Sequence, residues 1–151
     1  MSPWLRDRGM PYAGFSAGAA VAADRATLGG WRLHVAGRTR NVCPEEAAGG
    51  LDEVRVVAGL GLAPFCVEAH ASEWGTVSRL AAGVDARVIN QGWAVDEDTM
   101  LEICGGQVRV HGLGRAFRVT RQSSGVHLDA FDSSSAPVPL AQRENVAVSV
   151  P

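Results

Sequence analysis

The stretch YAGFSAGAAVAA, residues 12–23, decides how this chain is interpreted. A short apolar run, residues 12–15, leads into Ser16, and small residues with good helix propensity then continue to Asp24. This order predicts a buried strand that turns sharply into a helix, with the serine at the turn.

The five residues Gly14-Phe15-Ser16-Ala17-Gly18 have the spacing G-x-S-x-G of a nucleophile elbow. An elbow needs small neighbours because bulky side chains would collide at the turn. We therefore expect Ser16 to be an exposed nucleophile. Gly14, Ala17 and Gly18 would form the elbow, and the N–H of Ala17 would help to hold an oxyanion. The alternative is a serine that caps a helix between small residues.

A serine hydroxyl needs a base, and the chain offers His34, His70, His111 and His127. We favour His70 because it follows the apolar run 65–67 at the end of a predicted strand, where α/β sheets collect functional groups. The other three lie in an irregular segment, a hairpin strand and the C-terminal segment, where surface histidines are the simpler interpretation.

A catalytic histidine needs a carboxylate that orients its ring and stabilises the imidazolium. Asp96, Glu97 and Asp98 form the densest acidic cluster of the chain. A solvated loop and a cation site are the alternatives, and a cation site would need more oxygen ligands than this stretch supplies. Arg79, Trp74 and Trp93 are candidates to border a substrate pocket, with a solvated helix position and core packing as their alternatives.

Three segments together resemble the cyanophycinase and dipeptidase E family of serine peptidases: residues 12–23, GLGLAPFCVEAH at 59–70, and GWAVDEDTMLEI at 92–103. The order and spacing of the three segments match those of the family, as do their residues. Members of that family are similar to class I glutamine amidotransferase domains, with serine at the elbow in place of cysteine. The resemblance implies an α/β fold, the C-terminal portion of a flavodoxin-like parallel sheet with a β-hairpin extension.

Carried over by motif, the resemblance assigns the nucleophile to Ser16, the base to His70 and the orienting acid to Glu97. Asp96 and Glu68 are second choices for the acid. The implied activity is hydrolysis of a peptide or isopeptide bond through an acyl-enzyme, without a metal or cofactor. An α/β-hydrolase esterase is a competing hypothesis, with the order Ser16, then Asp96 or Asp98, then His111 or His127.

The family has a long segment before the elbow, and this chain has 15 residues there. That segment supplies the first strands of the sheet and a second oxyanion donor. Loss of one such donor costs about 2.7 to 4 kcal/mol of transition-state stabilisation. Three explanations are open: a gene fragment or misplaced start, a split protein with a complementing N-terminal half, or a decayed paralogue that no longer catalyses. A homo-oligomer is a further expectation, and an amidotransferase-like domain that binds a ligand or partner without turnover is the non-enzymatic alternative.

Composition indicates one domain, with 46% apolar content in 151 residues. We expect a peptidase-like domain at residues 1–121 and a loosely ordered tail at 122–151.

The net charge of −2 is spread along the chain, so nucleic acid is not an expected partner. All 14 basic residues are arginine, which excludes a lysine Schiff base. Three widely spaced cysteines and the lack of a membrane-length apolar run predict a cytoplasmic protein without a membrane partner.

Hydrophobic periodicity predicts a helix at residues 73–82 with Ser72 as its N-cap. Residues 100–104 and 108–111 flank Gly105-Gly106, which predicts a hairpin. Further strands are expected at 31–35, 54–57, 65–67, 86–89, 93–95 and 116–120.

Overall fold

The structure, a computed structural model, describes residues 9–140. The helices are α2 (Ala17–Val21), the 3-10 helix η1 (Glu45–Ala47) and α3 (Thr76–Asp85). The strands are β1 (Arg25–Gly29), β2 (Arg32–Val35), β3 (Arg38–Asn41), β4 (Arg55–Ala58), β5 (Cys66–Ala69), β6 (Gly92–Val95), β7 (Thr99–Cys104), β8 (Gln107–Gly112), β9 (Ala116–Gln122), β10 (Gly125–Phe131) and β11 (Val138–Pro139). No helix among residues 9–140 is long and apolar enough to cross a membrane.

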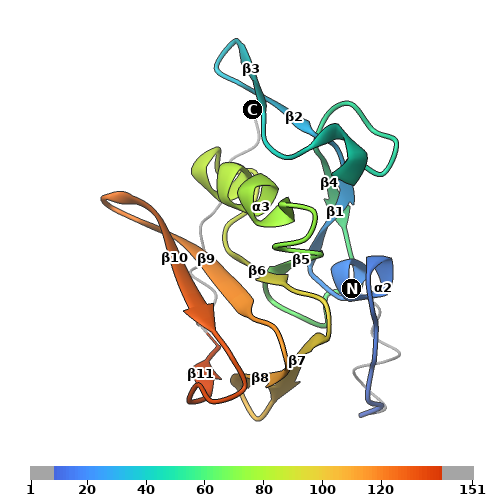
Figure 1. Cartoon of the computed structure of the whole chain (residues 1–151), viewed down its shortest axis with the longest axis vertical. Helices are drawn as coiled ribbons and strands as arrows, with labels where there is room; N and C mark the ends of the chain where they lie inside the picture. The colour runs from blue at the N-terminus through green and yellow to red at the C-terminus, as the bar shows by residue number, and fades with distance from the viewer. Residues whose placement is uncertain (1–8, 141–151) are drawn as a thin grey trace.

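The centre of the molecule is a four-stranded mixed sheet in the order β10-β9-β6-β5 (Figure 1). β5 and β6 run parallel, with Cys66 opposite Gly92 and Ala69 opposite Val95. β9 and β10 follow in antiparallel register. A parallel pair needs a crossover connection, and α3 provides it between β5 and β6.

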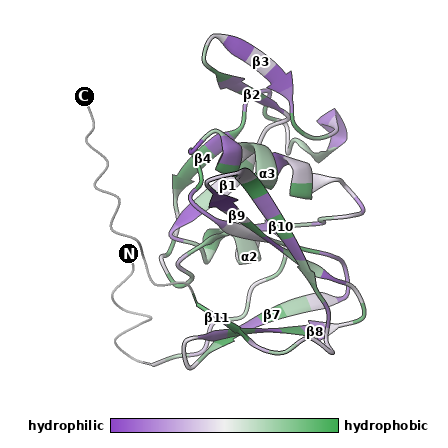
Figure 2. Cartoon of the chain, turned by 90° about the vertical axis from the view of Figure 1, so that its left-hand side faces the viewer, coloured by the Kyte–Doolittle hydropathy of each residue, from purple (hydrophilic) through white to green (hydrophobic). Residues whose placement is uncertain are grey.

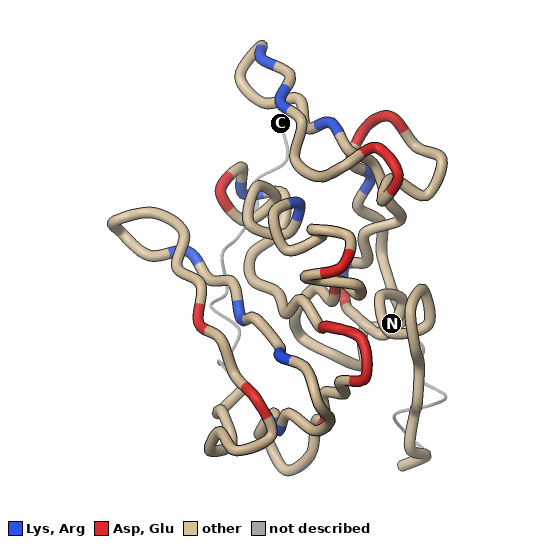
Figure 3. Tube along the Cα trace, in the orientation of Figure 1, with Lys and Arg blue, Asp and Glu red and all other residues tan. Residues whose placement is uncertain are grey.

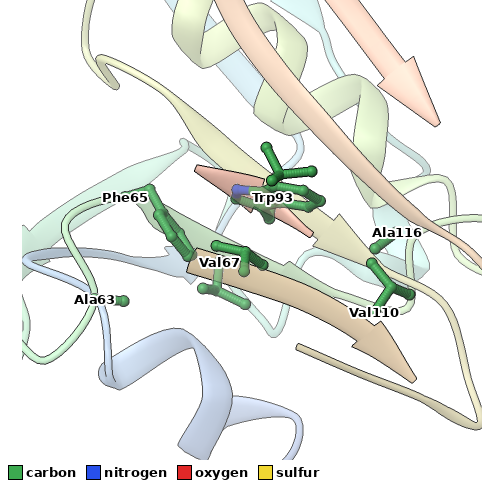
Figure 4. Close-up of a cluster of buried hydrophobic side chains, with 8 residues drawn as sticks. Ala63, Phe65, Val67, Trp93, Val110 and Ala116 are labelled. Carbon is green, nitrogen blue, oxygen red and sulfur yellow. The ribbon is translucent and has the colours of Figure 1, made fainter. Parts of the chain in front are cut away.

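Side chains alternate between the two faces of this sheet. On one face, Val67 and Trp93 pack with residues of β8 and β11 in a buried cluster (Figure 4). Trp93 also contacts the ring of Phe131, with 5.2 Å between the ring centroids. The three-stranded sheet β11-β8-β7 therefore covers this face.

The opposite face is covered by α3. Leu80 and Val84 of the helix are fully buried against Cys66, Ala94 and Val119 of the sheet. Gly92 allows this close approach, because a Cβ there would lie 2.5 Å from Leu80 Cδ1 and 2.9 Å from the Cys66 carbonyl oxygen. The sheet is thus the middle layer between a helix and a second sheet.

Two small antiparallel units complete the described chain. β1 pairs with β4 beside α2, and the β2–β3 hairpin projects away from the central sheet (Figure 1). Every residue of β3 is exposed, and Figure 2 shows this strand as mostly hydrophilic. The hairpin therefore contributes little to either buried cluster.

The predicted fold class is wrong. The structure is mostly β and holds several small sheets, and among the strands of residues 9–140 only β5 and β6 form a parallel pair. It is not a flavodoxin-like parallel sheet, because α3 supports one parallel connection, whereas the short turns between β7 and β8 and between β9 and β10 dictate antiparallel pairing. The expected hairpin extension is confirmed by β7 and β8.

Two local predictions around α3 are also wrong. The helix begins at Thr76 rather than Glu73, and Gly75 at φ 65° precedes it in place of the Ser72 cap. The expected strand at 86–89 is absent because the N–H groups of Val88 and Ile89 both donate to the Gly83 carbonyl, which closes the end of the helix.

The ends of the described chain differ from expectation as well. Residues 12–15 are extended but belong to no strand, so the elbow is entered from an unpaired segment. The predicted tail contains β10, which pairs with β9 along its whole length, and β11. Apolar and polar residues alternate along 126–130, a pattern typical of a strand. Residues 141–151 of the predicted tail lie outside the described residues.

A buried ion pair joins α3 to β5. The Arg79 guanidinium donates to both Glu68 carboxylate oxygens, at 3.0 Å and 2.6 Å, and also to the Gly30 and Ala47 carbonyls. Both side chains are at least 93% buried. Arg79 therefore ties the helix and the β1–β2 and η1 segments to the strand that ends at His70, and it does not border a pocket.

Replacement of Arg79 by methionine is expected to lower the free energy of unfolding by about 3 to 5 kcal/mol, because it leaves the Glu68 carboxylate buried without its partner. Urea unfolding of the variant measures this change. The double variant Glu68→Leu/Arg79→Met is the control and should be more stable than Arg79→Met alone. A stability within about 0.5 kcal/mol of wild type for Arg79→Met would contradict the structural role.

Candidate active site

Ser16 occupies a strained turn of the kind that an elbow requires. Its backbone lies at φ 49° and ψ −121°, a positive φ that non-glycine residues rarely adopt. α2 begins at the next residue, and the N–H of Ala20 donates to the Ser16 carbonyl at 3.1 Å. The turn leaves the serine exposed at the start of the helix.

The two elbow glycines have different roles. A Cβ on Gly14 would lie 2.6 Å from the carbonyl carbon and oxygen of Gly18, so only glycine fits there. A Cβ on Gly18 would meet only the Tyr12 hydroxyl, at 3.8 Å. Tyr12 in turn donates a hydrogen bond to the Gly18 carbonyl at 2.8 Å, which holds the incoming segment against α2.

His70 is the first residue after β5, and its ring meets the elbow serine. Its Nε2 lies 3.2 Å from Ser16 Oγ, a hydrogen bond between residues 54 positions apart. The backbone of His70 is left-handed, at φ 62°, which turns the side chain out of the line of the strand. This geometry suits a base that accepts the proton of a serine hydroxyl.

Glu97 lies on the other side of the same ring. Its Oε1 is 2.5 Å from His70 Nδ1, a short charge-assisted contact. Figure 3 shows the acidic run 96–98 as a red segment that follows β6. Ser16, His70 and Glu97 therefore form one continuous chain of hydrogen bonds, with the two ring nitrogens in the roles of a catalytic triad.

Trp74 stacks on His70, with ring centroids 4.0 Å apart and planes inclined by 21°. The tryptophan is about half exposed, at 48%. It covers one face of the imidazole and limits rotation of the ring. Sequence spacing named Trp74 only as a candidate pocket residue, because nothing in the pattern shows that the loop folds back on His70. Trp93, the other tryptophan considered, is buried in the core.

The other candidate acids have different partners. Glu68 is paired with Arg79. The Asp96 carboxylate accepts the backbone N–H groups of Ser72 and Arg115, at 3.0 Å and 3.1 Å. Neither acid has a hydrogen bond with His70 among the described residues, so Glu97 alone contacts the ring as a carboxylate.

The remaining histidines lie away from the elbow. His34 contacts Thr39 in the β2–β3 hairpin, His111 pairs with Glu102 across β7 and β8, and His127 pairs with Asp129 on β10. In the described chain, therefore, neither His111 nor His127 is hydrogen-bonded to Ser16, which the hypothesis of an α/β-hydrolase esterase would require.

The cysteines do not supply a nucleophile at this site. Burial raises the pKa of the Cys66 thiol to about 11, and burial also raises the pKa of Cys43. Both thiols are therefore protonated and unreactive at neutral pH. Cys104 is exposed at the far end of β7, in the hairpin.

The side chains of Ser16, His70 and Glu97 are accessible to solvent. Two surface depressions of the described chain lie elsewhere, one between β3 and α3 and one on the β7–β8 hairpin. No group of three or more histidine, cysteine or acidic residues within 9–140 is arranged to hold a metal ion.

Comparison with known protein families finds no matching family, and no curated protein is significantly similar in sequence.

Replacement of Gly14 by alanine is expected to destabilise the protein by about 1 to 3 kcal/mol, because the new methyl group would overlap the backbone of Gly18. Thermal unfolding measures the change. Gly18→Ala is the matched control. It places the same methyl group in open space on a helix and should be at least as stable as wild type. Equal stability of the two variants would contradict the elbow geometry.

Proposed function

We propose that the chain is a serine hydrolase that cleaves an acyl bond through a covalent acyl-enzyme on Ser16. The observation that carries this proposal is the continuous contact from Ser16 Oγ to His70 Nε2, at 3.2 Å, and from His70 Nδ1 to Glu97, at 2.5 Å. A serine that only caps a helix does not require hydrogen bonds from its hydroxyl through a histidine to a carboxylate. The strained backbone of Ser16 supports the same conclusion.

In the proposed reaction, Ser16 Oγ attacks the substrate carbonyl carbon while His70 Nε2 takes the hydroxyl proton. Glu97 keeps the proton of Nδ1 in place and stabilises the imidazolium. The tetrahedral intermediate then collapses, the carbon–leaving group bond breaks, and His70 returns the proton to the leaving group. Water, activated by His70, attacks the acyl-enzyme and releases the acid together with the free serine.

The N–H of Ala17 is the proposed donor to the oxyanion, because it follows the nucleophile and opens α2, where the first amides have no carbonyl partner within the helix. One amide supplies part of an oxyanion hole. The resemblance of the three motifs to serine peptidases favours a peptide or isopeptide bond as the substrate. The three free cysteines fit a cytoplasmic setting, which is part of this proposal.

A fluorophosphonate probe tests the proposal, since it phosphonylates only serines that a base activates. The wild-type chain should be modified at Ser16, which peptide mapping by mass spectrometry identifies. His70→Ala and Glu97→Gln should each slow the modification about 10²- to 10⁴-fold, the contribution of a general base and its orienting acid.

Asp98→Asn is the matched control for Glu97→Gln. It removes a neighbouring charge at a position with φ 52°, which asparagine tolerates well, and it should label at the wild-type rate. His127→Ala should also leave the rate unchanged. Absence of Ser16 modification in the wild-type chain would overturn the proposed function.

A further inference from the structure

Asp96, like Asp98, has no hydrogen bond with His70 among the described residues, yet it connects the two segments that carry His70 and Glu97. We propose that Asp96 is a positioning residue: its carboxylate clamps the His70 loop to the Glu97 turn and so sets the contact between the base and its acid. This inference rests on the proposed function, and it concerns a residue that the triad itself does not use.

One carboxylate oxygen holds the His70 loop. Oδ1 of Asp96 accepts the N–H of Ser72 at 3.0 Å, two residues after His70. The adjacent N–H of Ala71 donates to the Val95 carbonyl at 3.1 Å. These two bonds hold the residues that follow β5 against the end of β6 and against Asp96, the first residue after it.

The other oxygen anchors the same carboxylate to the central sheet. Oδ2 of Asp96 accepts the N–H of Arg115 at 3.1 Å, directly before β9 begins. The backbone N–H of Asp96 donates to the Arg115 carbonyl at 3.0 Å. Asp96 is therefore fixed from both its side chain and its backbone, and the His70 loop is fixed to the sheet through it.

The turn that carries Glu97 is packed tightly around this anchor. Gly114 has no room for a Cβ, which would lie 2.9 Å from both Asp96 Cβ and the Glu97 carbonyl oxygen. The Thr99 hydroxyl donates to that same Glu97 carbonyl at 2.9 Å. The N–H of Leu113 donates to the Asp98 carbonyl at 2.9 Å. The backbone of Glu97 is thus held in place, although its side chain is exposed.

The contact between His70 and Glu97 needs support from Asp96 because it is exposed to solvent. The side chains of His70 and Glu97 are 27% and 41% accessible, so water competes for both partners. His70 also has a strained, left-handed backbone, which persists only where its surroundings fix it. An exposed pair keeps a short contact when both backbones are fixed relative to each other. Asp96 directly precedes Glu97 in the chain, and its carboxylate bonds to Ser72 in the His70 loop.

Two variants of Asp96 test the proposal, each with two measurements. Asp96→Ala removes both acceptors, and Asp96→Asn keeps one acceptor and presents an amide to the other N–H. The first measurement is the rate of fluorophosphonate labelling of Ser16. We expect a loss of about 10- to 100-fold in Asp96→Ala, the scale of a displacement near 1 Å, and a smaller loss in Asp96→Asn.

The second measurement does not depend on activity. The ring nitrogen chemical shifts of neutral His70 report which nitrogen carries the proton. Because an ionised carboxylate only accepts hydrogen bonds, we expect the contact of Glu97 with Nδ1 to hold that proton on Nδ1 in the wild-type chain. In Asp96→Ala we expect a mixture of the two tautomers, because the clamp no longer holds Glu97 against Nδ1.

Asp132 provides the matched control. Its Oδ1 accepts the backbone N–H and the hydroxyl of Ser134, at 2.9 Å and 2.6 Å, in the turn after β10. Asp132→Ala therefore removes the same kind of side chain to backbone bond, far along the chain from the triad. It should leave both the labelling rate and the His70 tautomer unchanged.

An unchanged His70 tautomer in Asp96→Ala overturns the proposal, as does an equal effect of Asp132→Ala. If Asp96→Ala does not fold, Asp96→Asn decides by the same two measurements. If the wild-type chain does not label at all, the proposed function fails and the tautomer alone decides whether Asp96 sets the contact. The two failures are therefore distinguishable.

Discussion

The in-register parallel pairing of β5 with β6 is the constraint on which the site depends. Ala69 lies opposite Val95, so the next residues along both strands, His70 and then the Asp96 to Glu97 turn, emerge side by side at the same edge of the sheet. The carboxyl ends of parallel strands are where α/β proteins gather functional groups. Here a single parallel pair achieves this within a molecule that is otherwise mostly antiparallel.

The layers around that pair hold it in register. α3 covers one face and links back to β5 through the buried Arg79–Glu68 pair, and the β11-β8-β7 sheet covers the other face. The elbow approaches from outside these layers, on a segment that is not part of any sheet. The elbow is placed by Ala19, which packs against the buried cluster of Val67 and Trp93, and by the hydrogen bond of Leu60 N–H to the Val21 carbonyl. The hydrogen bond between Ser16 and His70 joins it to the end of β5.

The structure brings the predicted residues Ser16, His70 and Glu97 into contact, whereas the predicted fold class was wrong. Ser16 and His70 could be named because each follows a local signal, an elbow spacing and the end of an apolar run. An acidic cluster after a strand left Asp96, Glu97 and Asp98 open, and the choice of Glu97 came from the family resemblance of that stretch. The topology of the sheet could not be predicted, because the direction of each strand depends on which connections contain a crossover helix. Residues 86–89 have the composition of a strand, but the N–H groups of the last two bond to the Gly83 carbonyl and end α3. The roles of Asp96 and Trp74 depend on loops that fold back on the sheet, which no local pattern reveals.

A double-mutant cycle on His70 and Glu97 tests the central claim most directly. The rate of fluorophosphonate labelling of Ser16 would be measured for Glu97→Gln in the wild-type chain and in the His70→Ala background. Residues of one relay are strongly non-additive, so the account predicts a large loss in the wild-type chain and no further loss once His70 is removed. An equal loss in both backgrounds would contradict a relay from Glu97 through His70 to Ser16.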